Sequence, residues 1–508
     1  MSDTAQVFPD WLKSRVDASP DRIALIAEER SWTFAALDAE VTSTAQKLAT
    51  LGVVAGDRIA TLLHNGFVAA ILPHAALRLG ATLVPLNARL SEAEIAWQLS
   101  DAAPRLLIVE KRTFQGGAKV REENPSLTVA RIDADGASLP GIPSLAEVNG
   151  RDVSLRLEHD AATVLAVIYT SGTTGRPKGA MLTVSNFWWS ALGSALNLDN
   201  REDDRWLVCL PLFHVGGLSI LMRSVIYGIA AVVQDGFDAD AVNSAIDNDE
   251  VTLVSVVAVM LQRILDARSG RPFPPTLRCV LLGGGPAPKP LLDRCASIGT
   301  PVIQTYGLTE SCSQVVTLAP EDTLRKLGSA GKPLYPNELR IVSTDGSGAQ
   351  AEEPGEILVR GPVVMAGYFG NPEATATAIT DGWLHTGDIG RVDAEGYLYV
   401  LDRRDDLIVT GGENVYPAEV EAVLLSHPAI VEAAVIGVED QVWGQRVVAV
   451  ARLANDSDID ADELKEFCRA KLAGYKVPRE FRFVVEPLPR TASGKLRRSE
   501  LRESTVTP

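Results

Sequence analysis

The chain has few cysteines, and they lack the spacing that cysteine chemistry needs. Its 508 residues include five cysteines, which are Cys209, Cys279, Cys295, Cys312 and Cys468. No two of them form a C-x-x-C pair, so the sequence indicates neither a zinc site nor a disulfide framework. Because disulfides are rare in reducing compartments, this usage favours a cytoplasmic location.

Long apolar runs are also lacking. No uncharged apolar run reaches about 18 residues, the length that a membrane-spanning helix needs. Residues 1–16 carry Asp3 and Asp10 and have no apolar core of signal-peptide length. The sequence therefore predicts no membrane insertion.

Positive charge is in deficit. The chain has 48 Lys and Arg residues against 65 Asp and Glu residues, a formal net charge of −17. This balance argues against non-specific binding of nucleic acid, and an anionic nucleotide would need local basic residues to overcome the background field. Hydrophobic residues make up 46% and charged residues 22%, as in soluble globular proteins, and the length predicts two to four domains.

A segment rich in glycine and hydroxyl side chains, residues 169–179, is the most informative stretch. It reads Tyr-Thr-Ser-Gly-Thr-Thr-Gly-Arg-Pro-Lys-Gly and follows residues 163–168, an apolar run that predicts a buried strand. Loops at the ends of such strands commonly bind ligands in α/β proteins. Backbone N–H groups, hydroxyls and a lysine suit a polyphosphate. The residues expected to contribute are Thr170, Ser171, Gly172, Thr173, Thr174, Gly175 and Lys178.

This loop does not match the P-loop pattern G-x-x-x-x-G-K-[ST]. Gly172 and Gly175 have only two residues between them, and Lys178 is followed by Gly179. An ordinary surface turn is the alternative, since Ser, Thr, Gly and Pro also form turns. A turn needs two or three such residues, whereas here they fill most of the segment directly after a strand. Phosphate binding is therefore the favoured interpretation.

The order of predicted elements indicates a large α/β region followed by two smaller units. Residues 58–63 and 81–85 read as strands around a helix at 69–79, which is the βαβ order of a doubly wound sheet. Beyond Gly331, short strands broken by turns predict a small β-barrel-like subdomain, and the last hundred or so residues read as a small α+β domain. We therefore expect an N-terminal domain over 1–402 with its β-rich part at about 331–402, a hinge at 403–405 and a C-terminal domain over 406–508.

Two polar or glycine-rich segments follow further predicted strands. His214 comes after an apolar strand at 205–210, although a lone histidine in apolar company is more often packed and hydrogen-bonded than catalytic. Gly283, Gly284 and Gly285 come after the strand at 279–282. Bare backbone there lets a flat group approach closely, while a simple strand-to-helix turn is the alternative.

Two more segments carry groups that suit a nucleotide. Residues 305–310 read Thr-Tyr-Gly-Leu-Thr-Glu, in which the Tyr306 ring can stack on a base. The Glu310 carboxylate suits Mg²⁺, a hard cation that prefers oxygen ligands, although an exposed Glu is usually just solvated. Asp388, in Thr-Gly-Asp at 386–388, offers acceptors for the two vicinal hydroxyls of a ribose.

In this order, these segments resemble the motifs of the adenylate-forming superfamily, which comprises acyl-CoA synthetases, peptide-synthetase adenylation domains and luciferases. Residues 489–495, Pro-Arg-Thr-Ala-Ser-Gly-Lys, resemble its final motif. The resemblance covers nearly the whole chain and implies ATP, Mg²⁺ and coenzyme A as ligands. It implies catalytic roles for Lys495, Glu310, His214 and Thr170, with Glu310 on the metal, and a pivot between domains at Asp405.

The resemblance also implies which residues contact nucleotide or coenzyme A. Besides the phosphate loop, these are Gly284, Gly285, Thr305, Tyr306, Gly307, Thr309, Asp388, Arg403, Lys495, Gly411, Gly412 and Glu413. The carboxylic acid is expected beside His214, Gly283 and Gly307. A first half-reaction would form an acyl-adenylate and pyrophosphate. Rotation of the C-terminal domain would then replace Lys495 with residues 411–414, and coenzyme A would displace AMP.

Within the superfamily, the sequence most resembles the o-succinylbenzoate:CoA ligases of menaquinone biosynthesis. The residues that carry this resemblance are 186–190, 196–206, 281–290, 304–314 and 327–333. Such a substrate needs an aromatic slot and a partner for its second carboxylate. Arg223 is the predicted partner, with Ser219 as a hydrogen-bond donor, and a surface Arg that caps a helix is an equal alternative.

Other functions stay open from the sequence. A CoA ligase for another aryl or fatty acid would share the same motifs. An amino-acid adenylation enzyme usually has an Asp near the His segment, where residues 213–215 read Phe-His-Val. A luciferase-type oxygenase would share the fold, and a non-catalytic nucleotide-binding protein would be expected to lack Lys495 or Glu310. The sequence does not specify the oligomeric state, and a homo-oligomer is one option.

Overall fold

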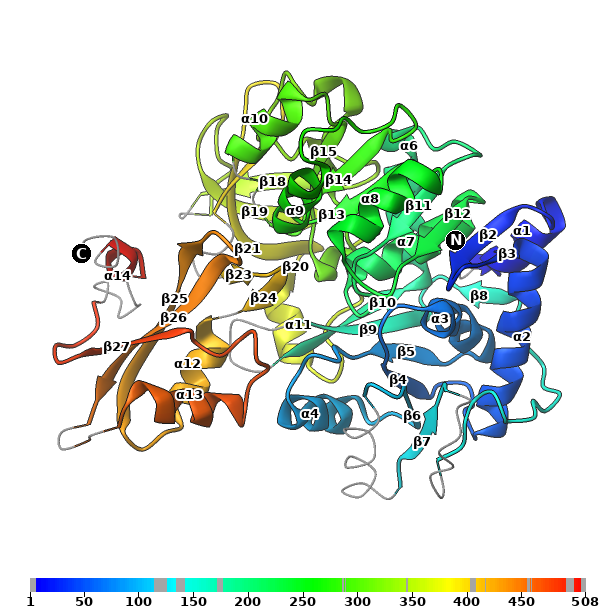
Figure 1. Ribbon diagram of the computed structural model, residues 1–508, viewed down its shortest axis with the longest axis horizontal. Coiled ribbons are helices and arrows are strands. Elements are labelled where there is room, and N and C mark those ends of the chain that lie inside the picture. Colours follow the sequence, from blue (N-terminus) through cyan, green and yellow to red (C-terminus); the bar gives the residue numbers. More distant parts are fainter. Residues whose placement is uncertain are drawn as a thin grey trace.

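The computed structural model has two large sheets, two smaller sheets and a two-stranded ribbon in its described part. The residues that it describes are all except 1–5, 114–125, 134–141, 171–176, 286, 288, 344–345, 403–407, 416, 455–456, 458, 490–497 and 504–508. The C-terminal residues, orange to red in Figure 1, form a lobe on one side of the larger body.

The first large sheet has six strands in the order β10-β9-β5-β4-β6-β7. All neighbours are parallel except β9 and β10, which form an antiparallel hairpin around the predicted phosphate loop. The bounds are β4 Arg58–Leu62, β5 Thr82–Pro85, β6 Leu106–Val109, β7 Thr128–Arg131, β9 Val164–Thr170 and β10 Lys178–Thr183.

The second large sheet has nine strands in the order β17-β16-β15-β14-β13-β11-β12-β2-β3. Its central strands, from β15 to β2, are parallel. The bounds are β2 Ile23–Ala27, β3 Arg30–Thr33, β11 Arg205–Val208, β12 Ala230–Val233, β13 Leu253–Val256, β14 Cys279–Leu282, β15 Val302–Tyr306, β16 Val316–Thr317 and β17 Lys332–Pro333.

The smaller sheets follow later in the chain. An antiparallel sheet contains β18 Glu338–Val342, β19 Gly355–Arg360, β20 Ile379–Thr380, β21 Trp383–Val392 and β22 Leu398–Asp402. The sheet of the C-terminal lobe contains β23 Ile408–Thr410, β24 Glu413–Val415, β25 Ile430–Asp440, β26 Gly444–Leu453 and β27 Glu480–Val484. The ribbon pairs β1 Val7–Pro9 with β8 Glu158–Asp160.

Helices cover the sheets. In the larger body they are α1 Trp11–Ala18, α2 Phe34–Thr50, α3 Phe67–Leu79, α4 Glu92–Ala102, α6 Val184–Leu198, α7 Val215–Tyr227, α8 Ala239–Asn248, α9 Ala258–Arg268, α10 Lys289–Ser297 and α11 Pro372–Ala378, with the 3₁₀ turns η1 Thr309–Ser311 and η2 Pro320–Asp322. In the lobe they are α12 Pro417–Leu425, α13 Ala461–Arg469 and α14 Arg498–Glu503.

Local sequence signals determine several of these boundaries. Thr33 caps α2, because its hydroxyl accepts a hydrogen bond from the backbone N–H of Ala36 at 3.2 Å. Asp460 and Glu463 form a capping box at the start of α13. The predicted doubly wound α/β body with a β-rich unit and a small C-terminal α+β unit is confirmed.

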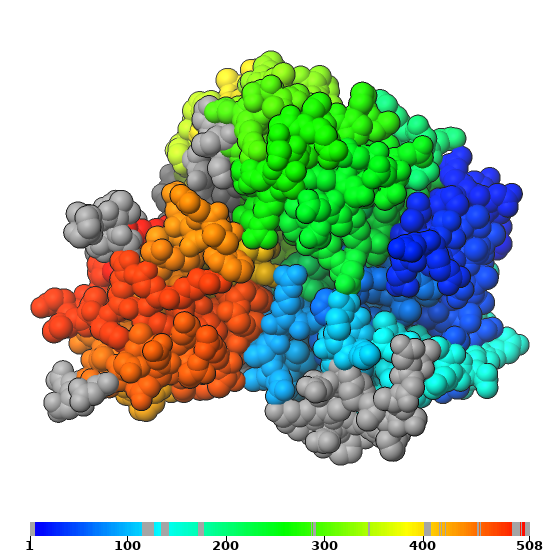
Figure 2. Space-filling view, viewed as in Figure 1, coloured from blue at the N-terminus to red at the C-terminus, as the bar shows by residue number. Residues whose placement is uncertain are grey.

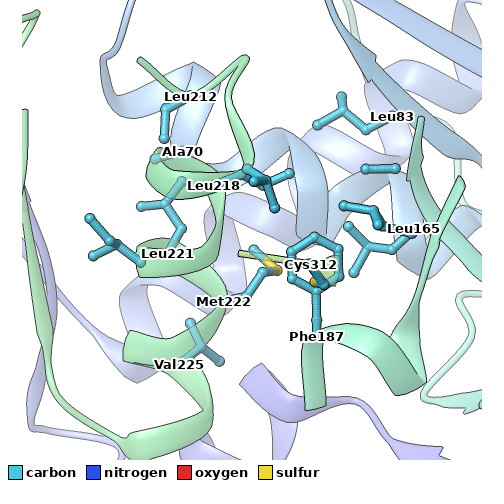
Figure 3. Packing of buried hydrophobic residues seen from close by; sticks show 14 of the residues in the cluster. Ala70, Leu83, Leu165, Phe187, Leu212, Leu218, Leu221, Met222, Val225 and Cys312 are labelled. Atoms are coloured by element: carbon cyan, nitrogen blue, oxygen red, sulfur yellow. The ribbon is translucent and has the colours of Figure 1, made fainter. Parts of the chain in front are cut away.

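The core explains why the parallel strands read as continuous apolar runs. On β11, Trp206 and Val208 belong to a cluster that joins both large sheets with α2, α3, α6 and α7, whereas Leu207 belongs to a cluster under α8 and α9. Both faces of the strand are therefore buried. Figure 3 shows Leu218, Leu221, Met222 and Val225 of α7 in the shared core near Phe187 of α6. This packing anchors α7, whose first turn reaches the site.

None of the described helices has the length and apolar character that crossing a membrane requires.

Gly307 follows β15 at a point where two stretches of backbone nearly touch. A Cβ atom placed there would lie 1.5 Å from the carbonyl oxygen of Ser313. We expect Gly307→Ala to lower the free energy of unfolding by about 1–3 kcal/mol or more, because the close backbone contact cannot accommodate a methyl group. Thermal unfolding followed by circular dichroism measures the change. Gly474→Ala is the matched control, since nothing lies within 4 Å of its added Cβ; equal melting temperatures for the two variants would contradict the expectation.

Candidate active site

A cavity of about 400 Å³ lies where the carboxyl ends of β11, β13, β14 and β15 face the C-terminal lobe. Parallel strands present their following loops at one edge, which is where α/β proteins bind ligands. The lining brings together many of the residues predicted from sequence. They are His214, Arg223, Gly283, Gly284, Thr305, Gly307, Thr309, Gly411, Gly412 and Glu413.

His214 is the N-cap residue of α7. Its side chain is half-exposed, and its ring packs against Phe213 with 4.6 Å between centroids. The Nε2 atom lies 3.4 Å from Oε2 of Glu413 in the lobe. The histidine that sequence alone left ambiguous therefore lies in the cavity wall and contacts the C-terminal unit.

Glu413 is buried, with a relative exposure of 4%. Burial alone would raise its pKa, but His214 and the guanidinium of Arg89, whose Nη1 lies 2.5 Å from Oε1, lower the pKa below its ordinary value. The carboxylate is therefore ionised near neutral pH. It holds residues 411–414 against two groups of the larger body, across the junction with the lobe.

A second hollow of about 110 Å³ adjoins the first, because Gly284, Thr305 and Gly307 line both. Gly285 and Tyr306 also line it. Gly283 lines the larger cavity beside it, where an added Cβ would meet Cγ2 of Thr305 at 2.8 Å. Backbone without side chains thus leaves a narrow slot that fits a flat ring such as a nucleobase.

Tyr306 and Asp388, predicted to contact base and ribose, lie together. The Tyr306 hydroxyl donates to Oδ2 of Asp388 at 2.8 Å, and both side chains are buried. The pair joins β15 of the nine-stranded sheet to β21 of the antiparallel sheet. A ribose placed beside the slot would find an oriented carboxylate.

Glu310 and Thr170 form the third part of the site, at the end of β9. The Thr170 hydroxyl lies 3.4 Å from Oε1 of Glu310, which also accepts a hydrogen bond from the hydroxyl of Tyr368 at 2.9 Å. Lys178 lies with Nζ 5.2 Å from the centroid of the Tyr368 ring. Carboxylate, hydroxyl and ammonium groups at one strand end suit phosphate oxygens and a hard cation.

The donor set fits Mg²⁺ as a companion of phosphates. In the part of the chain that the structure describes, no three His, Cys, Asp or Glu side chains are grouped to hold a metal ion. Mg²⁺ usually takes one or two carboxylates and completes its shell with water and substrate phosphates, so Glu310 with the Thr170 hydroxyl nearby is sufficient. Those two residues would hold the cation here.

The deep wall of the large cavity carries a buried cation. Arg223 has a relative exposure of 2%, its Nη2 donates to the Ser190 hydroxyl at 2.9 Å, and its Nε has no partner among the described residues. Burial lowers its pKa, and no carboxylate among the interacting groups compensates for it. The alternative of a surface Arg capping the helix does not fit this burial.

Ser219 is not brought into the cavity wall. It is buried on α7, and its hydroxyl donates to the carbonyl of Val215 one turn earlier at 2.5 Å. Gln314 lines the same cavity as Arg223. It is 2% exposed, and both of its amide atoms lack partners in the described part of the chain. Sequence reasoning assigned Gln314 no role, although this residue ends the stretch 304–314 that carries the resemblance to o-succinylbenzoate:CoA ligases.

Some predicted residues lie outside the described part of the chain. They are Ser171, Gly172, Thr173, Thr174, Gly175, Arg403, Asp405 and Lys495. Their roles stay predictions. Arg89 was also missed by sequence reasoning, since a polar residue after a predicted strand is ordinary in a connecting loop.

Comparisons with known proteins identify the family of the chain. The chain matches the AMP-binding enzyme family over residues 12–369 and the AMP-binding enzyme C-terminal domain over residues 419–495. The 2-succinylbenzoate–CoA ligase of Geobacillus kaustophilus (strain HTA426) is 50% identical over 498 residues, covering 97% of each chain.

Two solved structures of o-succinylbenzoate CoA synthetase from Bacillus subtilis are similar over the whole length. A double mutant bound to the product analogue OSB-NCoA is 44% identical with a TM-score of 0.90, covering 98% of this chain and 99% of that one. The complex with the acyl-adenylate intermediate OSB-AMP is 43% identical with a TM-score of 0.75, covering 99% of each chain. The resemblance to adenylate-forming enzymes is confirmed, and the chain belongs to the AMP-binding enzyme family.

Proposed function

We propose that this chain is an AMP-forming acid–thiol ligase that joins 2-succinylbenzoate to coenzyme A through an acyl-adenylate. The observation that carries the proposal is the buried Arg223 guanidinium, which has no carboxylate partner among the described residues and lines the cavity that adjoins the flat slot. The similar ligase and synthetase structures support the substrate. The reaction places the protein in menaquinone biosynthesis, as the sequence resemblance implied.

A second carboxylate on the substrate explains the deep wall of the cavity. A buried cation without a counter-ion is unfavourable, because it has lost the solvation of water. The Ser190 hydroxyl donates to the carbonyl of Cys312 at 2.7 Å and so only accepts from Arg223. A substrate carboxylate would neutralise Arg223, and the free amide of Gln314 would supply a further hydrogen bond.

In the first half-reaction, an oxygen of the substrate's other carboxylate attacks the α-phosphorus of ATP. The bond between the α-phosphorus and the bridging oxygen breaks, which releases pyrophosphate and leaves the acyl-adenylate. The two reactants are both anionic, so positioning and charge neutralisation dominate the barrier. Thr170, Lys178 and Glu310 would place the phosphates and the cation, and Lys495 would neutralise charge at the reacting carboxylate.

In the second half-reaction, the sulfur of coenzyme A attacks the acyl carbon, the thiol proton is lost and AMP leaves. Residues 411–414 line the cavity in this structure, which is the arrangement expected for this step. The TM-score is higher with the product-analogue complex than with the acyl-adenylate complex at nearly equal identity, which supports the same arrangement. A closed wall around the adenylate protects it from hydrolysis.

The reaction itself is the first test. Purified protein with MgATP and coenzyme A should convert 2-succinylbenzoate to its thioester with one AMP formed per thioester, while benzoate, malonate and a C8 fatty acid should react poorly. Chromatography of the thioester and of AMP measures both products. Efficient turnover of another acid would support the proposed mechanism but contradict the proposed substrate. Release of AMP without a thioester would contradict coenzyme A as the acceptor.

Arg223→Leu tests the acid subsite. We expect it to raise the KM for 2-succinylbenzoate by about 30-fold or more, because losing one partner of a buried charge pair costs about 2–5 kcal/mol. Gln314→Leu should raise it less, since it removes a neutral partner. Activity with benzoate, which has no second carboxylate, should not fall in either variant.

Ser219→Ala is the matched control for these variants. It lies one turn before Arg223 on α7, and its hydroxyl is already used within the helix, so the KM should stay unchanged. An unchanged KM in Arg223→Leu would reject the assignment of Arg223.

Lys495→Ala separates the two half-reactions. Adenylate formation, measured as pyrophosphate release in a single turnover, should slow by about 10²–10³-fold, the usual effect of losing one group that stabilises developing charge. Thioester formation from supplied acyl-adenylate should be little changed, since Lys495 is expected to leave the cavity for that step. Lys465→Ala, another lysine of the C-terminal unit, should affect neither step.

A further inference from the structure

A buried cluster of three charges joins the C-terminal lobe to the larger body. The ammonium of Lys476 lies 2.6 Å from Oε1 of Glu94 and 2.7 Å from Oε1 of Glu419. All three side chains are less than 10% exposed. Glu94 belongs to α4 of the larger body, whereas Glu419 and Lys476 belong to the lobe, and Figures 1 and 2 show α4, in light blue, at this junction.

The three charges have unequal environments. Burial would raise the pKa of Glu94, but Lys476 and the hydrogen bonds from Ser91 hold it below its ordinary value. Burial, together with the charge of Glu94, raises the pKa of Glu419. The two carboxylates raise the pKa of Lys476 despite its burial. Lys476 therefore stays charged and attracts both carboxylates at once.

The cluster can separate without leaving an uncompensated buried charge. Lys476 and Glu419 form a neutral pair inside the lobe, so they can leave together. Glu94 keeps hydrogen bonds from the backbone N–H and hydroxyl of Ser91, at 2.8 and 2.7 Å, in the capping box of α4. Breaking a buried ion pair is normally costly because one charge stays behind unpaired. Here each side retains a partner, which suits a contact that forms and breaks in every catalytic cycle.

The same short segment of the larger body positions the lobe at other points. Asn87 donates from Nδ2 to the Tyr475 hydroxyl at 3.2 Å, and Arg89 pairs with Glu413. The Ser91 hydroxyl oxygen, whose shorter hydrogen bond goes to Glu94, also lies 3.1 Å from the carbonyl oxygen of Lys471. Residues 87–94 thus hold the lobe in the orientation in which residues 411–414 line the cavity.

We propose that Glu94 is a positioning residue for thioester formation, because its contact with Lys476 holds the lobe in the orientation that presents residues 411–414 to the acyl-adenylate. The inference rests on the proposed function. It assigns Glu94 no role in adenylate formation, which requires the lobe to turn Lys495 toward the cavity instead.

Glu94→Gln tests this role. The amide oxygen of Gln can still accept the hydrogen bonds of Ser91, whereas its NH₂ group cannot pair with Lys476. Thioester formation from supplied acyl-adenylate should slow by about 10-fold, within the range of about 5- to 150-fold that couplings between sites produce. Pyrophosphate release in a single turnover without coenzyme A should stay within about twofold of wild type, because the contact is proposed to act only in thioester formation. A merely structural role of Glu94 would instead lower the rates of both steps together.

Glu92→Gln is the matched control, since it removes the same charge from the same turn of α4 at an exposed side chain. It should leave both steps unchanged. Lys476→Met removes the ion pair from the other side. In thioester formation, the double variant Glu94→Gln/Lys476→Met should be no slower than Lys476→Met alone, because both substitutions remove one contact.

Several outcomes would overturn the inference. Equal slowing of both half-reactions in Glu94→Gln, unchanged thioester formation, or strictly additive effects in the double variant would each do so. Failure of the proposed function is distinguishable, because wild-type protein would then form no acyl-adenylate from 2-succinylbenzoate. If another acid is activated instead, the comparison of the two half-reactions in Glu94→Gln proceeds with that acid.

Discussion

A charged side chain loses the solvation of water when it is buried, so it needs a compensating partner. Arg78 meets this requirement with two carboxylates, since Nη2 lies 2.9 Å from Oδ1 of Asp10 and 2.5 Å from Oδ1 of Asp38. Lys476 meets it with two as well. Within the described part of the chain, Arg223 meets a neutral hydroxyl, that of Ser190, and the Trp206 ring, 5.8 Å away. The first contact lies within the larger body and the second joins that body to the lobe, whereas the third is the one that the proposed substrate would complete.

The fold brings these charges and the glycine segments to one place because the sheets are parallel. Loops after β11, β14 and β15 leave the nine-stranded sheet at the same edge, and the loop after β9 leaves the six-stranded sheet. Each strand is buried on both faces, so ligands can approach only at its end. The cavity, the flat slot and the Thr170–Glu310 pair therefore adjoin, and an acid, a nucleotide and its phosphates can lie end to end.

Much of this arrangement is predictable from sequence where the signal is local. Thr33 and Asp460 cap helices through groups two or three residues away, and β14 has the bounds that its apolar run predicts. Contacts between distant residues carry no such signal, as between His214 and Glu413 or between Glu94 and Lys476. On α7, the periodicity of apolar residues does not show which side faces the cavity, because the helix is buried on nearly all sides. Spacing alone therefore could not separate Arg223, which lines the cavity, from Ser219, which bonds within its own helix.

The polar character of the junction suits the proposed turning of the lobe between the two half-reactions. The lobe has its own apolar clusters, formed by residues between Ile408 and Leu501, and in the described chain neither cluster includes a residue of the larger body. Turning the lobe therefore leaves both of its hydrophobic cores intact, and the cost of motion falls on hydrogen bonds and ion pairs that water can replace. An apolar junction would hold one orientation at the expense of the other half-reaction. Contacts such as Arg89 with Glu413 are directional enough to select an orientation and weak enough, at a half-exposed guanidinium, to release it.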